Sequence, residues 1–312
     1  MNDPRREVLV LGGGPDAERE VSLASAAAVA TALRSAGYTV HERTIDRVTL
    51  DELRDLPGDV IAPILHGPFG EGGPLQDLLE RDGRPYIGAP PRAARLAMDK
   101  VASKLIAATL GASVTPSAVF DPDDPACPLE LPVVVKPVKE GSTIGLFMCK
   151  THEEWDAAHR ATAARARPAM VEPCICGREI TVGIVAGEAL PIIEIAPAEG
   201  LYDYDAKYQR DDTRYTARPE LPAGVAERVS RDALALARAI GCACLSRADF
   251  LLTPDGTPWL LEINTMPGFT DHSLVPMAAR ATGVEMPTLC ARLVDEAVTQ
   301  RGPRPAAEGV FA

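Results

Sequence analysis

The chain has 312 residues, and its 32 Lys and Arg against 44 Asp and Glu give a formal net charge of −12 at pH 7. A chain of this length divides into two or three domains of ordinary size. Its negative charge is the wrong sign for neutralising a phosphate backbone, which excludes nucleic acid as an expected partner. The hydrophobic fraction of 46% contains no long uncharged run, so we expect a soluble globular protein without a membrane span.

Cysteine usage and the first residues indicate the compartment. The seven cysteines include two close pairs, Cys174 with Cys176 and Cys242 with Cys244, whose C-x-C spacing differs from that of zinc and thioredoxin-type sites. We interpret them as free, buried thiols. The N-terminal segment has only a short apolar run between arginines and glycines, unlike a secretory signal. We therefore expect a cytoplasmic protein.

Strands and helices alternate in the first third of the chain. The apolar run Val8–Leu11 is closed by glycines and followed by an Ala-rich segment over Glu20–Ser35, which predicts a strand and a helix. Further strands are expected at Tyr38–Glu42 and Val60–Leu65, with another helix after Pro74. This alternation is typical of a parallel sheet covered by helices, so we predict an N-terminal α/β domain over residues 1–98.

The middle of the chain is richer in strands. A helix over Met98–Leu110 is expected to precede strands at Leu131–Pro137 and Leu146–Lys150, and a helix over His152–Arg165 follows them. The stretch Arg178–Ile195 alternates around two glycines and predicts two β-rich pieces.

The last third begins with a long polar segment, Leu201–Thr216, which has no periodicity and is interpreted as a functional loop. The tail over Arg301–Ala312 is rich in Pro and Ala and is expected to be disordered. Between them we predict a helix, two strands joined by a Pro-Asp-Gly turn and a final helix: Gly224–Ile240, Leu245–Leu252, Trp259–Ile263 and Met286–Thr299.

Two glycine-rich or charged segments near the N-terminus bear on ligand binding. Gly12, Gly13 and Gly14 follow a strand but lack the G-x-G-x-x-G spacing of a dinucleotide site. Glu18 and Glu20 stand at the start of a predicted helix. They are either a solvated charge cluster or the partners of a cationic substrate group.

Lys136 ends the apolar strand Val133–Pro137, where a buried ammonium group needs an anionic partner. The loop Glu140–Gly145 supplies small residues and backbone N–H groups, as in a flap that closes over phosphates. The P-loop pattern is absent from the sequence, so another scheme of phosphate binding is expected.

Oxygen donors converge near the end of the chain. Alternation along the strand predicts that Glu262 and Asn264 share one face, whereas Leu261 and Ile263 share the other. With Asp249 on the neighbouring antiparallel strand they form a donor set suited to Mg²⁺. The alternatives are a half-solvated strand and, for Asp249, a simple ion pair with Arg247. His66 and His272 stand alone and form no catalytic triad pattern.

Taken together, the motifs resemble those of the D-alanine–D-alanine ligases of the ATP-grasp superfamily. The similar segments occur in family order along nearly the whole chain: GPDAEREVSL, HGPFGEGGPLQ, AMDKVASK, VVVKPVKEGSTIG, YDYDAKY, SRADF and LLEINTMPGFTDHSLVPMAAR. The resemblance implies an N-terminal parallel-sheet domain followed by a two-lobed ATP-grasp fold, an α/β and α+β architecture. We expect the two ATP-grasp lobes over residues 99–182 and 183–300, followed by a disordered tail over 301–312. The resemblance also implies a homodimer.

The resemblance also implies the cofactors and their ligands. ATP and two Mg²⁺ ions are expected, with Mn²⁺ as a substitute. The positions that match the family's ATP contacts are Lys100, Lys136, Glu172, Ile175, Glu179 and Lys207. The positions that match its metal ligands are Asp249, Glu262 and Asn264.

For the two D-alanines, the resemblance implies two subsites and a reacting centre. Glu18 matches the residue that holds the first ammonium group, with Ser142 and Tyr208 as its hydrogen-bonded partners and His66 nearby. Arg247 and the Gly268 N–H match the oxyanion donors. Ser273 and Leu274 match the groups that bind the second carboxylate. The flap over Val138–Ile144 is expected to meet the loop over Tyr202–Tyr215 and exclude water.

The sequence departs from the family pattern at a few places. Gly72 and Pro74 interrupt the usual Gly-Glu-Asp-Gly-Thr run, Ala26 replaces a glycine, and Pro173 replaces a common lysine beside the adenine site. The implied activity is ATP-dependent ligation of two D-alanines through an acyl phosphate, for peptidoglycan precursors. The alternatives are a ligase that takes D-lactate or D-serine as second substrate, and a nucleotide-binding regulator. Tyr208 favours the dipeptide, and the intact metal set and Ser142 favour an enzyme.

Overall fold

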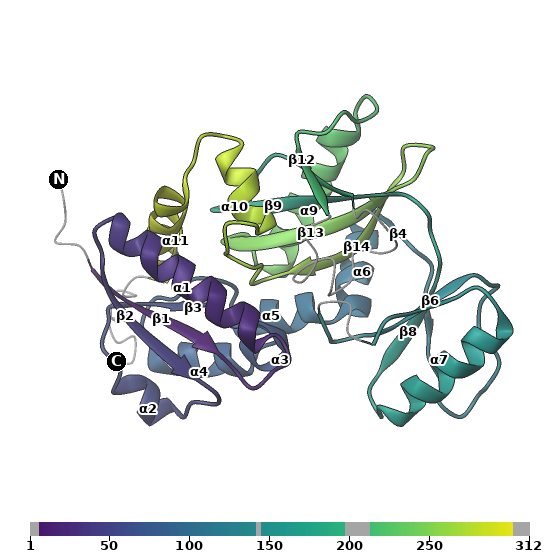
Figure 1. The fold of residues 1–312 in the computed structure, drawn as a ribbon, viewed down its shortest axis with the longest axis horizontal. Helices are drawn as coiled ribbons and strands as arrows, with labels where there is room; N and C mark the ends of the chain where they lie inside the picture. The colour runs from purple at the N-terminus through teal and green to yellow at the C-terminus, as the bar shows by residue number, and fades with distance from the viewer. Residues whose placement is uncertain (1–5, 142–144, 197–212, 302–312) are drawn as a thin grey trace, which may run out of the picture.

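The computed structural model describes residues 6–141, 145–196 and 213–301, which form three sheets with helices packed on them (Figure 1). The first sheet is parallel and three-stranded, in the order β2-β1-β3. Its strands are β1 (Glu7–Gly13), β2 (Thr39–Ile45) and β3 (Val60–Pro63). The predicted N-terminal α/β arrangement is therefore confirmed.

The helices of this first region are short except for α1 (Arg19–Ser35), which packs along β1 and β2. Ser22 on α1 accepts the Gly13 N–H at 2.8 Å and donates to the Ile64 carbonyl at 2.5 Å, which ties the ends of β1 and β3 to the helix. The remaining helices are α2 (Leu50–Arg54), α3 (Gly67–Gly70), α4 (Pro74–Asp82) and α5 (Pro91–Met98).

The prediction of one helix over Met98–Leu110 is wrong at its start. Asp99 has extended backbone angles and separates α5 from α6 (Lys100–Thr109), and its side chain accepts the Ala102 N–H at 3.0 Å as an N-cap. Asp is a strong N-cap residue, so a new helix begins here with Lys100 in its first turn. This break places Lys100 at the site described below.

The second sheet is antiparallel and four-stranded, in the order β5-β8-β6-β7. Helix α7 (His152–Ala164) starts with a capping box between Thr151 and Glu154, and its buried Trp155 packs into the sheet's core. The strands are β5 (Ala118–Val119), β6 (Val133–Pro137), β7 (Phe147–Cys149) and β8 (Ala169–Pro173), of which β5 and β8 were not predicted.

The third sheet has seven strands, and its path runs β12-β11-β9-β13-β14-β4 with β10 paired to β9. Where two β-rich pieces were predicted there are three strands, because Ala186 and Gly187 turn the chain before β10. The predicted boundary between residues 182 and 183 falls inside β9. The strands are β4 (Ser113–Val114), β9 (Arg178–Val185), β10 (Glu188–Ala189), β11 (Ile193–Ala196), β12 (Arg214–Ala217), β13 (Leu245–Leu252) and β14 (Pro258–Asn264).

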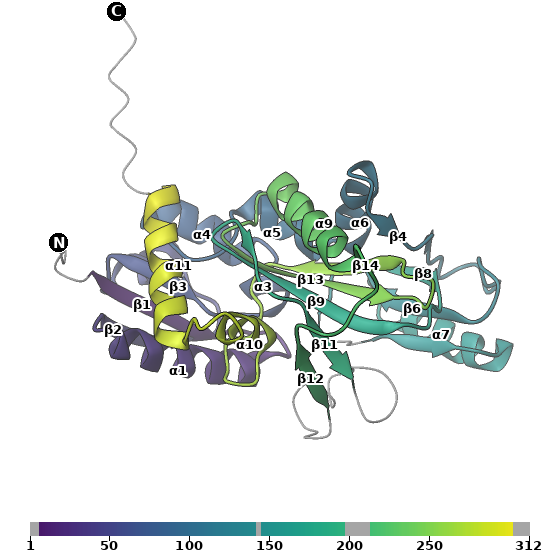
Figure 2. The same cartoon turned by 90° about the horizontal axis from the view of Figure 1, so that it is seen from above.

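Helices α5, α6 and α9 (Val225–Ile240) cover one face of this sheet, and their apolar residues form one buried cluster with β9, β13 and β14. After β14 come α10 (Leu274–Arg280) and α11 (Met286–Arg301). Helix α11 returns to the first sheet and packs beside α1, as both views show (Figures 1 and 2). The two ends of the described chain therefore share one core.

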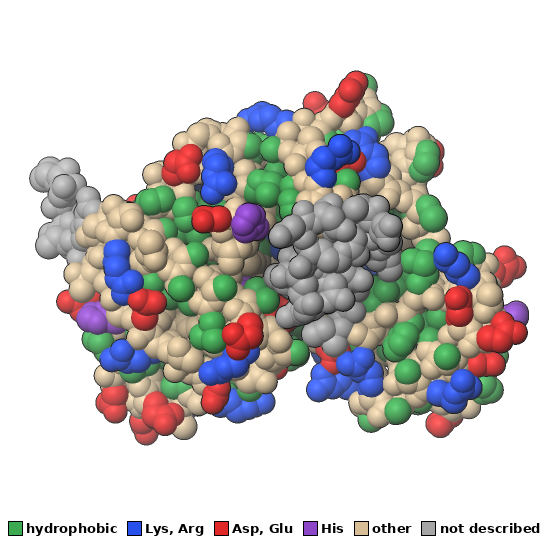
Figure 3. All heavy atoms as spheres, viewed as in Figure 1, with side chains coloured by type: hydrophobic (Ala, Val, Ile, Leu, Met, Phe, Trp, Pro, Cys, Tyr) green, Lys and Arg blue, Asp and Glu red, His purple; other side chains and the backbone are tan. Residues whose placement is uncertain are grey.

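Most of the predicted long loop over Leu201–Thr216 and the tail beyond Arg301 lie outside the described residues, but Arg214–Thr216 belongs to strand β12. None of the helices that the structure describes is both long and apolar enough to cross a membrane. On the face shown in Figure 3, described side chains of both charge signs are interspersed.

Candidate active site

A cavity between the four-stranded and seven-stranded sheets collects most of the predicted nucleotide and metal residues. Its walls come from α6, β6, β8, β9, β13 and β14, together with the loop that follows β8. The predicted residues that line it are Lys100, Lys136, Glu172, Ile175, Glu179, Asp249 and Glu262. Residues separated by more than a hundred positions in sequence thus meet in one place.

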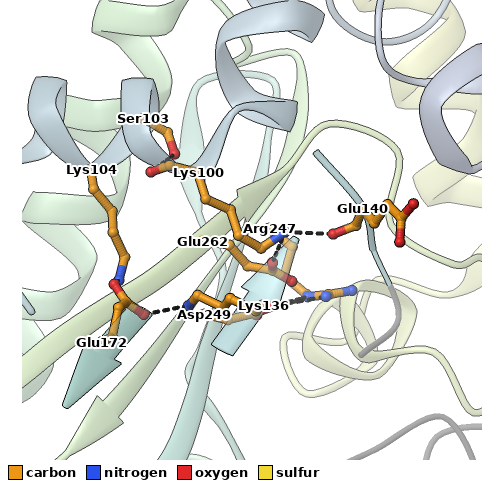
Figure 4. A network of polar contacts seen from close by, with 9 residues as sticks. All are labelled: Lys100, Ser103, Lys104, Lys136, Glu140, Glu172, Arg247, Asp249 and Glu262. Atoms are coloured by element: carbon orange, nitrogen blue, oxygen red, sulfur yellow. Dashed lines mark hydrogen bonds and ion pairs between the residues drawn. The ribbon is translucent and has the colours of Figure 1, made fainter. Parts of the chain in front are cut away.

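Glu172 is the anionic partner that Lys136 was expected to need. The two lie on the paired strands β6 and β8, where Glu172 is opposite Val134, and Lys136 Nζ is 2.6 Å from Glu172 Oε2. Burial alone would raise the pKa of Glu172, but Lys136 and Lys104 outweigh it and hold that pKa below its ordinary value. Glu172 therefore stays ionised between two cations (Figure 4).

Lys104 was missed by the sequence analysis, although it lies in the AMDKVASK segment. It stands one helical turn after Lys100 on α6, is 4% exposed, and pairs with Glu172 Oε1. Thr115 accepts from Lys104 Nζ at 2.7 Å and donates to the same carboxylate oxygen at 2.5 Å. Burial lowers the pKa of Lys104 to about 8. The i, i+4 spacing of two lysines was the available signal.

Replacing Lys104 by Met is expected to destabilise the fold and to weaken nucleotide binding. Removing one partner of a buried ion pair costs about 3 kcal/mol, because the remaining carboxylate loses its charge compensation. Glu172 would also lose the contact that orients it toward the cavity. Urea unfolding and the KM for ATP measure the two effects, with exposed Lys150→Met as the control. An unfolding free energy equal to that of the control would contradict this role.

Lys100 lies at the other side of the cavity and contacts two of its walls. Its Nζ is 3.1 Å from Glu262 Oε2 and donates to the Glu140 carbonyl at 2.5 Å (Figure 4). Its backbone N–H donates to the Val138 carbonyl at 3.1 Å. Lys100 thus joins the start of the predicted flap to strand β14.

The predicted oxygen donors lie on paired strands. Asp249 on β13 is opposite Glu262 on β14, and Arg247 is opposite Asn264. Among the described residues no three His, Cys, Asp or Glu side chains form a metal-binding group, so the donor set is two carboxylates and one amide. Both carboxylates reach the cavity, and oxygen-only sets suit Mg²⁺, so these residues fit the ion.

The predicted placement of Leu261 is wrong. Ile263 is buried in the core on the far face of β14, as alternation predicts, but Leu261 lines the cavity with Glu262. The pairing register shifts at this point, since Asp249 pairs with Glu262 and Phe250 pairs with Leu260. A β-bulge at Leu261 therefore interrupts the alternation.

Arg247 and Asp249 form the ion pair that was the simpler reading of their proximity. The guanidinium donates to both carboxylate oxygens, at 2.9 Å from Nε and 2.8 Å from Nη2. Buried Thr181 on β9 donates to Asp249 Oδ1 at 2.5 Å and was also missed in the sequence. The ion pair fixes both side chains. Asp249 can still serve as a metal ligand, because a carboxylate has several lone pairs and accepts several bonds.

A second group of buried polar residues lies on the side of the N-terminal sheet. Glu18 is 8% exposed at the start of α1, and a Cβ on Gly141 would lie 3.3 Å from its Oε2. His66 contacts the Met266 carbonyl through Nδ1 at 2.9 Å. Burial lowers the pKa of His66, so the neutral ring donates from Nδ1 and Nε2 is an acceptor without a partner among the described residues.

Glu71 is the second buried acid here, after Glu18, and was not predicted. Its Oε1 accepts the Gly67 N–H at 3.2 Å and its Oε2 accepts the Met266 N–H at 3.1 Å. Burial, with a contribution from Glu18, raises the pKa of Glu71 to about 8, against opposing effects of the two N–H groups and Arg247.

The raised pKa predicts how stability depends on pH. A carboxyl that titrates at about 8 when folded and at 4.5 when unfolded binds its proton more tightly in the fold, so its contribution is full below 4.5 and is lost as pH rises through 8. We expect the melting temperature of the protein to fall from about pH 6 to about pH 9 more steeply than that of Glu71→Gln. Parallel curves would contradict this assignment, since Glu18, His66 and Arg247 remain in the variant.

The segment after β14 carries the remaining predicted residues. A Cβ on Gly268 would lie 2.9 Å from Ser273 Oγ, so these two residues are in close contact. Ser273 Oγ accepts the Thr270 N–H at 2.9 Å, and Leu274 begins α10 beside it. Ser142, Lys207 and Tyr208 lie outside the described residues, as does most of the loop expected to meet the flap.

The departures from the family pattern have local explanations in two cases. A Cβ at Gly72 would lie 2.4 Å from the Pro68 carbonyl oxygen, so the loop after α3 is too tight for a larger residue. A Cβ at Gly12 would lie 2.7 Å from the Ala26 methyl group, which shows that Ala26 packs directly on the end of β1. Pro173 lines the cavity between the two sheets.

Comparison with known proteins gives a consistent result. Residues 124–295 match the family model described as D-ala D-ala ligase C-terminus. The D-alanine–D-alanine ligase of Anaeromyxobacter sp. (strain Fw109-5) is 42% identical over 298 residues, which cover 94% of this chain and 97% of that protein. The Bacillus anthracis D-alanine–D-alanine ligase complexed with ATP superposes with a TM-score of 0.82 at 28% identity, covering 95% of this chain and 98% of that one. The VanG D-Ala:D-Ser ligase of Enterococcus faecalis superposes with a TM-score of 0.81 at 25% identity, covering 94% of this chain and 100% of that one.

Proposed function

The chain belongs to the D-alanine–D-alanine ligase family, and on that premise we propose that it joins two D-alanines at the expense of ATP, releasing ADP and phosphate. The observation that carries the proposal is the convergence of Lys100, Lys136 and two carboxylates on one cavity. Cations of this kind attract phosphates, and the carboxylates suit the metal that accompanies them. The dipeptide would serve peptidoglycan precursor synthesis.

ATP would occupy the cavity between the two sheets. Lys100 and Lys136 would bind its phosphates, while Glu172, Ile175 and Glu179 would contact the adenosine. Lys207 is assigned to ATP by resemblance alone. Two Mg²⁺ ions held by Asp249, Glu262 and Asn264 would neutralise phosphate charge.

In the first step a carboxylate oxygen of one D-alanine attacks the γ-phosphorus of ATP, and ADP leaves. Glu18 is buried beside Gly141 and is suited to hold the ammonium group of this D-alanine. His66 Nε2, which has no partner among the described residues, can accept a further N–H from the same group. Ser142 and Tyr208 are assigned to this subsite by resemblance alone.

In the second step the neutral amine of another D-alanine attacks the acyl phosphate carbon, and phosphate leaves once the tetrahedral intermediate collapses. Arg247 and the Gly268 N–H would stabilise the oxyanion, a type of contact worth roughly 3–4 kcal/mol per donor. Ser273 and Leu274, at the start of α10, would bind the second carboxylate.

Phosphate release from ATP in the presence of D-alanine tests the proposal. We expect ADP, phosphate and D-alanyl-D-alanine in equal amounts, and little product with L-alanine. D-Lactate and D-serine are the controls for the alternative second substrates. Equal phosphate release with L-alanine, or no dipeptide with D-alanine, would contradict the proposed activity.

The same proposal places the enzyme in the cytoplasm, where ATP is present and thiols remain reduced. The seven cysteines, which all lie in the described part of the chain, form no disulfide; Cys149, Cys242, Cys244 and Cys290 are buried, whereas Cys176 is exposed. A homodimer is expected by resemblance, and its mass in solution by light scattering tests that expectation.

A further inference from the structure

We propose that Glu71 is a positioning residue, which accepts the Met266 N–H so that the Asn264 amide oxygen can turn to a metal ion while the following segment keeps its place. The inference rests on the proposed function, because that function assigns Asn264 to Mg²⁺. It concerns a residue outside the assigned ligands. The observation behind it is a single N–H group with two acceptors.

The Met266 N–H points between two oxygen atoms. Asn264 Oδ1 accepts it at 2.8 Å, and Glu71 Oε2 accepts it at 3.1 Å. An amide oxygen that binds a hard cation gives up part of its capacity to accept hydrogen bonds. Without Glu71, the metal would therefore compete with a buried backbone N–H for the same oxygen, and leaving such a group unpaired is costly.

Glu71 places one carboxyl oxygen at each of two buried backbone N–H groups. It is 5% exposed, and its other oxygen accepts the Gly67 N–H at 3.2 Å, so both oxygens face backbone donors. Together with Glu262 and Asn264 it lines one small cavity beside the nucleotide site. Outer contacts of this kind orient metal ligands, and their loss commonly reduces metal affinity by about 10–100-fold.

The segment over Thr265–Phe269 has three further contacts with the N-terminal region. His66 Nδ1 donates to the Met266 carbonyl at 2.9 Å, and Ser25 Oγ accepts the Phe269 N–H at 3.1 Å. Thr265 Oγ1 donates weakly to the Glu71 carbonyl at 3.4 Å. Ser25 therefore holds the same segment as Glu71 without touching Asn264, which makes it a matched control.

Isothermal titration of ADP with and without Mg²⁺ separates these roles in the full-length protein. In Glu71→Ala we expect the gain in ADP affinity on adding Mg²⁺ to fall by about tenfold, with metal-free ADP binding unchanged. Ser25→Ala should keep the full gain. Glu71→Gln retains one acceptor oxygen and is expected to lie between wild type and Glu71→Ala, which keeps the test decisive if the alanine variant does not fold.

Steady-state kinetics with D-alanine supply the second readout. In both Glu71 variants, the fold decrease in kcat should exceed the fold increase in the Kd for ADP measured without metal. The inference would be overturned if both Glu71→Gln and Glu71→Ala kept the wild-type gain in ADP affinity on adding Mg²⁺. It would also be overturned if Ser25→Ala lost as much of that gain as the Glu71 variants. Because the titration needs no turnover, its outcome is independent of whether wild type makes D-alanyl-D-alanine, which the kinetic assay reports separately.

Discussion

Replacing Glu262 by Gln is expected to reduce turnover at saturating Mg²⁺ by about 10³-fold while the fold survives, because the amide cannot supply the charge that a hard cation requires. Glu262 also pairs with Lys100 at 3.1 Å, so the variant removes this ion pair and leaves the ammonium group its hydrogen bond to the Glu140 carbonyl. ATP would then be held mainly by lysines, with less neutralisation of the charge that develops during transfer.

The measurement is kcat for dipeptide formation, accompanied by thermal unfolding of the variant without ligands. Glu188→Gln is the matched control, because Glu188 lies on β10, is 69% exposed and pairs only with Arg292 among its described contacts. Turnover by Glu262→Gln within threefold of this control would contradict the metal assignment.

Replacing Lys136 by Met is expected to lower kcat/KM for ATP by about 10²–10³-fold, the cost of losing one preorganised donor to a developing charge. The Lys136 side chain is 10% exposed and lines the cavity, and its Nζ is held at 2.6 Å by Glu172. Met keeps most of the side-chain volume but removes the ammonium group, so Glu172 retains Lys104 and Thr115 as its described partners. The KM for the first D-alanine should change little.

Lys150→Met serves as the control for Lys136→Met, because Lys150 is exposed and is not among the residues that line the cavity. Initial rates over a range of ATP concentrations separate the two kinetic constants. A kcat/KM for ATP equal to that of Lys150→Met would show that Lys136 does not contact the nucleotide.

Much of the fold could be predicted because local patterns carry it. The strand over Leu245–Leu252 was predicted at its bounds, and its pairing with the next strand places Asp249 opposite Glu262. Likewise, an ammonium group at the end of an apolar strand requires a partner, and Glu172 supplies it. Here residue chemistry and periodicity were sufficient.

The features that were missed depend on long-range pairing or on breaks in a pattern. Strand β8 was not predicted because only its pairing with β5 and β6 makes it a strand. The bulge at Leu261 reverses its face, and one extra residue leaves no mark on composition. In the sequence, Glu71 and Lys104 look like any other charged residues. They differ from surface charges only because they are buried, and this burial arises when the sheets assemble.

The most direct test of ATP-driven ligation through an acyl phosphate uses D-alanine labelled with ¹⁸O in its carboxylate. If a carboxylate oxygen attacks the γ-phosphorus and phosphate leaves from the resulting carbonyl carbon, that oxygen passes to phosphate. We predict one ¹⁸O atom in each phosphate released per dipeptide formed, by mass spectrometry. Unlabelled phosphate released together with D-alanyl-D-alanine would contradict the account.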